Sequence, residues 1–148
     1  MDETGAIIGG ESSGGLTVKG HISGKDGIYA AALLVEMLAV TGKSVSELFA
    51  EITAQYGNPC WAEADFRMTP ERKAELQKLL FTEKRVPEFG TAVDHISLED
   101  GCKVYFKDGS WVICRFSGTE PLLRMAAEAD EQAVADGYIK AFRDMLEL

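Results

Sequence analysis

Residues 27–40 constrain the fold most, because this segment is apolar around nearly its whole circumference when wound as a helix. Asp26 is placed to cap the start of that helix, and Gly42 to end it. Such a helix must be buried on most of its surface, since each large side chain left in water forgoes about 1.5–3 kcal/mol. Residues 1–58 offer one convincing strand, at 6–8, to cover it. We therefore expect the covering sheet to come from missing upstream sequence or from another copy of the chain, which makes the chain a fragment.

A second helix and a linker complete this first part. Ser44 and Glu47 have the spacing of a capping box, which predicts a helix that runs to about Tyr56. Gly-Asn-Pro at 57–59 is the strongest linker signal in the chain. The sequence thus predicts an α/β remnant over residues 1–58, a strand and two helices of a three-layer domain, and a separate domain over residues 59–148.

Residues 59–148 have the pattern of an α+β domain. Strands are predicted at 61–68, 92–98, 103–106 and 111–116, with a further candidate at 122–128 and a hairpin turn at 107–110. Thr69 and Pro70 predict the start of a helix that runs to about Leu80, and Asp130 is expected to cap a closing helix that runs to about Glu147. The expected architecture is a four-stranded, mainly antiparallel sheet with helices on one face.

The charge of the chain limits what it can bind. Its 15 Lys and Arg residues against 24 Asp and Glu residues give a net charge of -9. Such a surface repels phosphodiester backbones and anionic lipids, so nucleic-acid and membrane binding are not expected. The longest apolar run, 28–40, is shorter than the roughly 20 residues of a membrane span. Cys60, Cys102 and Cys114 show no CxxC pair, which indicates buried thiols in a reducing compartment, the cytoplasm.

Residues 115–121 contain the groups that an oxyanion site needs. A guanidinium, two hydroxyls and a flexible backbone position are supplied by Arg115, Ser117, Thr119 and Gly118. Side chains two apart on an extended segment share one side, so the first three can converge. An ordinary polar turn in which Glu120 pairs with Arg115 explains the same residues. Arg124 is either a second cation or a plain surface residue.

The loop at residues 10–14 has a different character. A carboxylate and hydroxyls among glycines suit neutral polyol hydroxyls, with Glu11 accepting and Ser13 donating or accepting. A tight turn after a strand explains these residues as well. His21 and Lys25 follow shortly, and their plainer interpretations are a structural histidine and a surface pair between Lys25 and Asp26.

Together the two loops suggest a ligand with hydroxyls and an anionic group, such as a sugar phosphate. GGESSGG at 9–15, with GHI at 20–22 and KDGIY at 25–29, resembles the sugar-binding loop region of the α-D-phosphohexomutases, the phosphoglucomutase/phosphomannomutase family. RFSGTEP at 115–121 resembles the phosphate-binding loop of that family's last domain. The two motifs stand in the right order with a linker between them, and the match covers nearly the whole chain.

The resemblance implies a four-domain, magnesium-dependent isomerase and phosphoprotein. Such an enzyme moves a phosphoryl group between the 1- and 6-positions of a hexose, with a glucose 1,6-bisphosphate-type activator. By the match, Glu11 and Ser13 bind sugar hydroxyls, and the non-reacting phosphate is held by Arg115, Ser117, Gly118 and Thr119. His21 and Lys25 match positions near the reacting end, and Arg124 would support the phosphate site from its margin.

Neither the family's catalytic serine loop nor its Asp-Gly-Asp-x-Asp-Arg-like magnesium loop occurs in this sequence. Phosphoryl transfer needs a nucleophile in line and a cation, so we expect the chain alone to be inactive and to hold no catalytic residue or metal ligand. Residues 1–58 would end the third domain, and residues 59–148 would form the fourth. The expected partners are a hexose phosphate, the parent enzyme's other domains, and further copies of the chain through the uncovered helix. The alternative is a stand-alone, non-catalytic sugar-phosphate-binding module.

Overall fold

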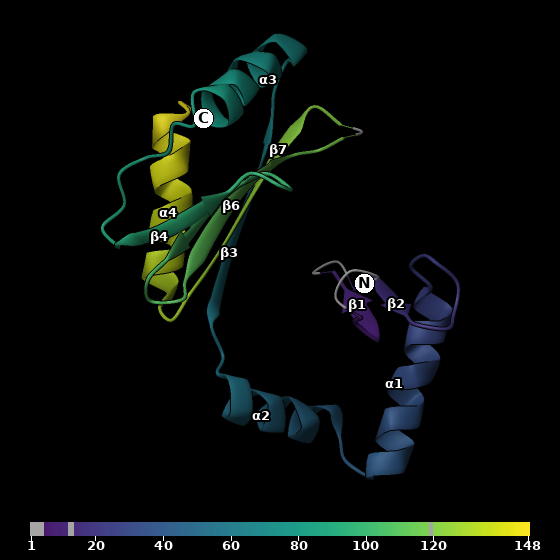
Figure 1. Cartoon of the computed structure of the whole chain (residues 1–148). Helices are drawn as coiled ribbons and strands as arrows, with labels where there is room; N and C mark the ends of the chain where they lie inside the picture. The colour runs from purple at the N-terminus through teal and green to yellow at the C-terminus, as the bar shows by residue number, and fades with distance from the viewer. Residues whose placement is uncertain (1–4, 12–13, 119) are drawn as a thin grey trace. The chain divides into compact units, whose positions relative to one another are not determined.

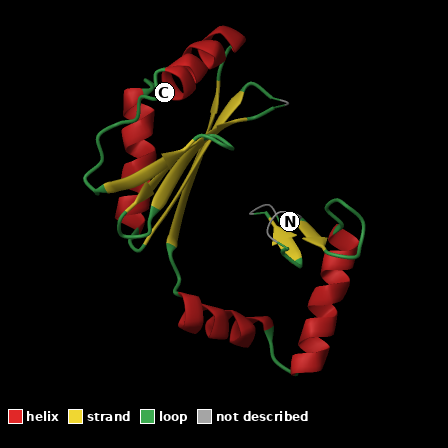
Figure 2. Cartoon of the chain, viewed as in Figure 1, coloured by secondary structure: helices red, strands yellow, loops and turns green. Residues whose placement is uncertain are grey.

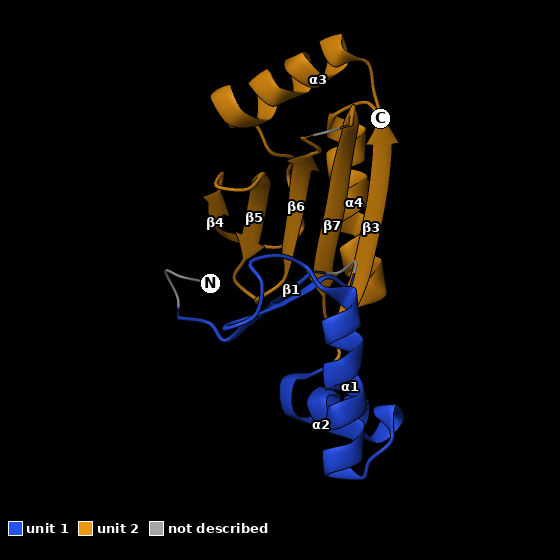
Figure 3. Cartoon of the chain, turned by 90° about the vertical axis from the view of Figure 1, so that its right-hand side faces the viewer, with its two compact units in different colours: residues 1–57 blue, residues 58–148 orange. Residues whose placement is uncertain are grey.

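The computed structural model describes residues 5–11, 14–118 and 120–148, and the chain divides into two compact units (Figure 3). The first unit comprises residues 1–57 and the second unit residues 58–148. Figures 1 and 2 show the helices and strands of each unit.

The first unit contains a two-stranded sheet and two helices. Strand β1 (Ile8–Gly10) pairs antiparallel with β2 (Leu16–Val18), and helices α1 (Gly27–Thr41) and α2 (Val45–Tyr56) follow. The strand at 16–18 was not expected from the sequence, because a run of three residues is too short to show an alternating pattern.

Both helices of the first unit begin and end where local signals predict. The Asp26 carboxylate accepts hydrogen bonds from the N–H groups of Ile28 and Tyr29 at the start of α1. Gly42 ends α1 in the left-handed conformation, at φ 67°. Ser44 forms the predicted capping box at the start of α2.

No described side chain of the first unit is buried, although α1 is strongly apolar. Ile28 and Val40 of α1 are 87% and 79% exposed, and Phe49 of α2 is 59% exposed. Within the described residues, the first unit therefore offers no cover for α1, as expected from the sequence. No single described helix is long and apolar enough to cross a membrane, whereas α1 and α2 taken together, bent by 87°, reach that length and composition.

The second unit is a five-stranded antiparallel sheet with helices packed on one face. Its strands lie in the order β3-β7-β6-β5-β4. The elements in chain order are β3 (Cys60–Arg67), α3 (Pro70–Gln77), the π-helical turn η1 (Lys78–Thr82), β4 (Val93–Ser97), β5 (Cys102–Phe106), β6 (Trp111–Phe116), β7 (Leu122–Ala129) and α4 (Gln132–Met145).

Two expectations for this unit were wrong. The sheet has five strands instead of four, because β3 pairs along its whole length with β7, a long-range pairing that no hairpin signal marks. The last helix is not capped by Asp130; it begins after Glu131, whose side chain makes no capping hydrogen bond. Its apolar face, packed on the sheet, stabilises this helix in place of a cap.

The core of the second unit lies between α4 and one face of the sheet. Alternate residues of β5, β6 and β7 are buried there against Phe142 of α4, and α3 adds Leu76. Cys102 and Cys114 belong to this core, and burial raises the pKa of Cys102 to about 11 and holds that of Cys114 well above its ordinary value. The expectation of buried thiols is confirmed for these two, whereas Cys60 is only half-buried.

The opposite face of the sheet carries polar and aromatic side chains in cross-strand rows. One row runs through all five strands: Trp61, Glu128, Trp111, Tyr105 and His95. The Lys103 ammonium lies 3.9 Å from the centroid of the Trp111 ring, and the His95 and Tyr105 rings stack at 4.4 Å. Such pairs stabilise the sheet itself.

Candidate functional site

The glycine-rich loop of the first unit connects β1 to β2, and backbone hydrogen bonds join its two sides. The Glu11 N–H donates to the Gly15 carbonyl at 3.0 Å, and the Gly14 N–H donates to the Glu11 carbonyl at 2.9 Å. Gly14 has a φ of +84°, which favours glycine. The tight turn expected from the sequence is therefore present. Ser13, expected to bind sugar hydroxyls, lies outside the described residues.

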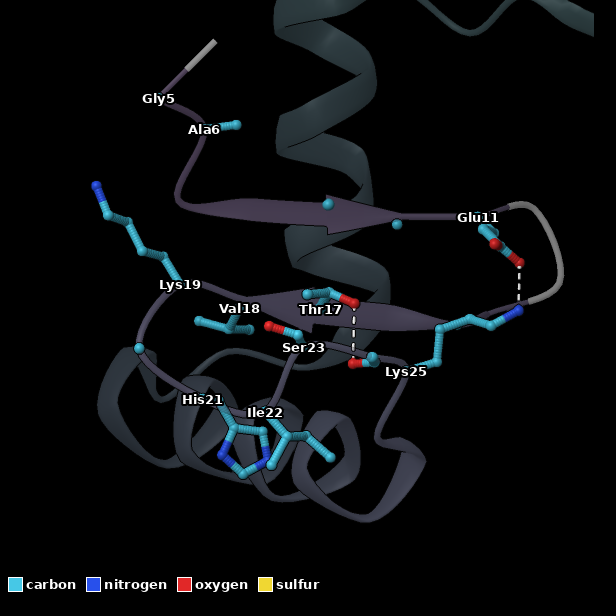
Figure 4. Close-up of a pocket in the computed structure, with 15 residues that line it drawn as sticks. Gly5, Ala6, Glu11, Thr17, Val18, Lys19, His21, Ile22, Ser23 and Lys25 are labelled. Atoms are coloured by element: carbon cyan, nitrogen blue, oxygen red, sulfur yellow. Dashed lines mark hydrogen bonds and ion pairs between the residues drawn. The ribbon is translucent and has the colours of Figure 1, made fainter. Parts of the chain in front are cut away.

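Glu11 and Lys25 form an ion pair at the edge of this loop. The Lys25 ammonium donates to Glu11 Oε2 at 2.9 Å, and both side chains are more than half exposed (Figure 4). The surface pair between Lys25 and Asp26 expected from the sequence is wrong, because the Asp26 carboxylate instead caps α1 and bonds His21. The loop thus presents an acceptor and a cation side by side.

Gly15 determines how Lys25 reaches Glu11. A Cβ atom at Gly15 would lie 2.3 Å from Lys25 Cδ and 3.0 Å from Lys25 Cγ, both well inside van der Waals contact. The aliphatic chain of Lys25 therefore passes directly over the Gly15 backbone. Any larger residue at position 15 would push Lys25 away from its present path.

His21 is held by two neighbours. Its Nε2 lies 2.8 Å from Asp26 Oδ2, and its ring stacks on Tyr29 with 4.0 Å between centroids. The hydrogen bond with His21 is the main cause of a lowered pKa for Asp26, followed by the bonds from the Tyr29 and Ile28 N–H groups. These contacts fix the position of the His21 ring beside the start of α1.

The loop and the segment that leads to α1 surround a pocket of about 660 Å³. Its lining includes Glu11, Thr17, Lys19, His21 and Lys25 (Figure 4). The Thr17 hydroxyl donates to the Gly24 carbonyl at 2.9 Å, and this bond connects β2 to the segment that leads to α1. The volume is within the usual range for small-molecule sites.

The second candidate site is the connection between β6 and β7. The Ser117 N–H donates to the Leu122 carbonyl at 2.9 Å, and the Ser117 hydroxyl accepts from the Glu120 N–H at 3.2 Å. Gly118 follows and is exposed, whereas Thr119 lies outside the described residues. The described part of this connection is bonded to itself, and it offers the Ser117 hydroxyl and the exposed Gly118 backbone.

Two arginines lie on the strands that flank this turn, close to its two ends. Arg115 on β6 and Arg124 on β7 are register partners, and Asp65 of β3 is next in the row. Arg115 Nε lies 3.1 Å from Asp100 Oδ1, and Arg124 lies 3.9 Å from Asp65. The expected pair between Arg115 and Glu120 is wrong, because Glu120 lies across the turn beside Arg124, at 3.7 Å.

Like charges placed directly opposite each other destabilise a sheet, so this arginine pair is not explained by stability alone. Two exposed guanidiniums can bind a phosphate through several charge-assisted hydrogen bonds. The sequence left Arg124 as either a second cation of an anion site or a plain surface residue. Its position opposite Arg115 favours the second cation.

Sequence reasoning missed Lys73 of α3. Its ammonium donates to the Ser117 carbonyl at 2.8 Å, across 44 positions of sequence, and no local pattern could have indicated this contact. Among the described residues, no three His, Cys, Asp or Glu side chains cluster as a metal site would require.

Comparisons with known proteins match both units. Residues 1–56 match the family model "Phosphoglucomutase/phosphomannomutase, alpha/beta/alpha domain III", and residues 63–145 match that of the C-terminal domain. A phosphoglucomutase/phosphomannomutase of Thermococcus kodakarensis is 34% identical over 98% of this chain, which covers 29% of that protein. A probable phosphoglucosamine mutase of Methanosarcina acetivorans is 40% identical over 89% of this chain, which covers 27% of that protein.

A solved structure of a phosphoglucomutase/phosphomannomutase family protein from Burkholderia thailandensis is similar in fold. It matches 99% of this chain with a TM-score of 0.66 and 25% identity, and the match covers 29% of that chain. The chain therefore spans less than a third of the length of these relatives.

Proposed function

Since the chain belongs to the phosphoglucomutase/phosphomannomutase family, we propose that it is the substrate-recognition part of an enzyme that interconverts hexose 1-phosphates and hexose 6-phosphates. In this proposal residues 1–58 end a sugar-binding third domain, and residues 59–148 form a phosphate-binding fourth domain. The reaction passes through a hexose bisphosphate, and a glucose 1,6-bisphosphate-type molecule is the activator.

The register pair of Arg115 and Arg124 carries the proposal for the phosphate. Both guanidiniums stand beside a turn that offers the Ser117 hydroxyl and the exposed Gly118 backbone. A phosphate oxygen accepts strong hydrogen bonds from such donors. We assign the non-reacting phosphate to this turn, with Thr119 as a further ligand on the strength of the family motif.

The pocket of the first unit supports the proposal for the sugar. Glu11 offers a carboxylate that accepts from hydroxyl groups, and Lys25 offers a donor 2.9 Å away from it. A hexose can satisfy both groups with neighbouring hydroxyls. Ser13 joins this set on the strength of the family motif, and Lys25 and His21 lie nearest the reacting end in the proposal.

The described residues bind and orient the substrate without transferring its phosphoryl group. Phosphoryl transfer needs an in-line nucleophile and a cation that neutralises the developing charge. The family's catalytic serine loop and magnesium loop do not occur among these 148 residues, so in this proposal other domains of the parent enzyme supply them. The exposed apolar surface of α1 favours this reading over a stand-alone module, because such a surface needs a covering partner.

We place the protein in the cytoplasm. The thiols of Cys60, Cys102 and Cys114 are free, as is usual in a reducing compartment.

Isothermal titration with glucose 1-phosphate, mannose 1-phosphate and unphosphorylated glucose tests the proposal. We expect the two phosphates to bind measurably more tightly than glucose, and Arg115→Gln to abolish that difference. Arg143→Gln is the matched control, because Arg143 lies on α4 and pairs with Asp144 of the same helix. Equal affinity for glucose and glucose 1-phosphate, or no effect of Arg115→Gln, would refute the proposed phosphate site.

A further inference from the structure

Lys73 joins α3 to the turn between β6 and β7. Its ammonium group donates to the Ser117 carbonyl at 2.8 Å, in a half-buried position. The same turn is tied to the start of α3 a second time, because the Met68 N–H donates to the Pro121 carbonyl at 3.0 Å. Both ends of the turn are therefore fixed to the segment that begins α3.

Ser117 is held through all its backbone polar atoms as a result. Its N–H donates to the Leu122 carbonyl, and its carbonyl accepts from Lys73. Its hydroxyl accepts from the Glu120 N–H and has its own O–H left to donate. Removing the bond from Lys73 would release the carbonyl and let the peptide plane between Ser117 and Gly118 rotate.

Lys73 has no close acidic partner among the residues that the structure describes. Among residues 5–11, 14–118 and 120–148, no carboxylate oxygen lies within 4.0 Å of its ammonium, whereas Arg115 and Arg124 have Asp100 and Asp65 as acidic neighbours. A half-exposed ammonium without such a partner leaves its positive charge available to an anion that binds at the adjoining turn.

We propose that Lys73 is a third cationic residue of the phosphate site, which positions Ser117 through its carbonyl and adds positive charge behind a bound phosphate dianion. The proposal rests on the proposed function, because it assigns a phosphate to the same turn. Lys73 acts through Ser117 and through its field, so it is a positioning residue and touches no reacting atom.

The test compares four variants of the chain in titrations with inorganic phosphate and with glucose 1-phosphate. Lys73→Met removes both the hydrogen bond and the charge, Lys73→Gln removes the charge, and Lys73→Arg keeps the charge. Lys78→Met is the matched control, since Lys78 is an exposed lysine of the adjoining η1 turn that pairs with Glu83. Urea unfolding of each variant verifies that the second unit remains folded.

We expect Lys73→Met and Lys73→Gln to weaken the binding of both ligands about five- to tenfold at low salt. Lys73→Arg should recover most of the affinity, and Lys78→Met should bind like the unaltered chain. Unchanged affinity in Lys73→Met with an intact fold would overturn the proposal.

The pH dependence separates a charge effect from a merely structural one. A phosphate monoester loses its second proton at a pH of about 6, so it is a monoanion at about pH 5 and a dianion at about pH 7.5. A lost cation weakens binding of the dianion more than that of the monoanion, so the loss in Lys73→Met should be larger at the higher pH. An equal loss at both values would contradict the proposed contribution of charge.

The failure of this inference differs from the failure of the proposed function. If Arg115→Gln binds phosphate as well as the unaltered chain, the turn is not the phosphate site and both proposals fail. If Arg115→Gln loses binding while Lys73→Met keeps it, the proposed function stands and the role of Lys73 is refuted.

Discussion

Arg115 and Arg124 lie directly opposite each other on the adjacent antiparallel strands β6 and β7. Opposed like charges cost a sheet a few tenths of a kcal/mol to about 1 kcal/mol, and here acidic neighbours at both sides of the pair reduce that cost. Asp65 lies beyond Arg124 in the row, and Asp100 lies beside Arg115. The sheet thus holds the two arginines opposite each other before any ligand arrives, which lowers the cost of bringing them around a phosphate.

Arg124→Gln should therefore weaken phosphate binding without destabilising the fold. We expect a loss of about 1.5–3 kcal/mol in the binding free energy of glucose 1-phosphate, the value for a hydrogen bond to a charged group. The free energy of unfolding should stay the same or rise slightly, because the repulsion with Arg115 disappears. Paired calorimetric and urea measurements verify this. Lower stability with unchanged affinity would mean that Arg124 serves only the surface ion pairs.

Gly15→Ala should act on the sugar site through Lys25 alone. The added Cβ would displace Lys25 from Glu11, so we expect the affinity for glucose 1-phosphate to fall and that for inorganic phosphate to remain. A double-mutant cycle with Lys25→Met gives the control, because the alanine should cost nothing further once Lys25 is truncated. Additive losses in the cycle would show that Gly15 acts by another route.

Truncation of a phenylalanine to alanine should lower the unfolding free energy in the second unit but not in the first. Phe142 is fully buried in the second unit, so Phe142→Ala should cost about 3–5 kcal/mol of unfolding free energy. Phe49→Ala in α2 should change the stability of this chain by less than about 0.5 kcal/mol, because Phe49 is exposed here. Chemical denaturation followed by tryptophan fluorescence reports on the second unit, and circular dichroism reports on both. A large loss for Phe49→Ala would show that the apolar helices are covered in solution.

Local signals made most of the fold predictable. Asp26, Ser44 and Thr69 cap helices because each lies directly before the backbone N–H groups it binds. The hairpin at 107–110 is likewise set by neighbouring residues, with the Gly109 N–H bonded to the Phe106 carbonyl. That no described side chain of the first unit is buried followed from one apolar helix and one visible strand.

Long-range relationships could not be predicted. The pairing of β3 with β7, the opposition of Arg115 and Arg124, and the bond from Lys73 to Ser117 each depend on how distant segments are aligned. The pairing of Lys25 with Glu11 instead of Asp26 depends on the same alignment, across 14 positions. Composition and spacing place such residues in their elements, but tertiary packing selects their partners.

The start of α1 should be sensitive to acid. Hydrogen bonds from His21, Tyr29 and Ile28 lower the pKa of Asp26 below the ordinary 3.8. A lowered folded-state pKa means that the stabilisation is present above the unfolded-state value and is lost as the pH falls through the folded value. The amide signals of Ile28 and Tyr29 should therefore shift toward those of an unfolded chain only below pH 3.8.

Asp26→Asn provides the control for this acid transition. Asparagine caps helices about as well as aspartate and does not titrate in this range, so the variant should keep α1 at neutral pH and lose the transition. An unchanged transition in Asp26→Asn would place its origin in another group.

In the proposed function, the turn around Arg115 binds phosphate and the turn around Glu11 binds the sugar. Amide chemical-shift mapping of the chain tests it most directly, in parallel titrations with inorganic phosphate, glucose 1-phosphate and glucose. We predict that inorganic phosphate moves the signals of Arg115, Ser117 and Gly118 but not those of Gly10 and Glu11, and that glucose 1-phosphate moves both sets. Saturation with glucose 1-phosphate that leaves the signals of residues 115–118 in place would contradict the account.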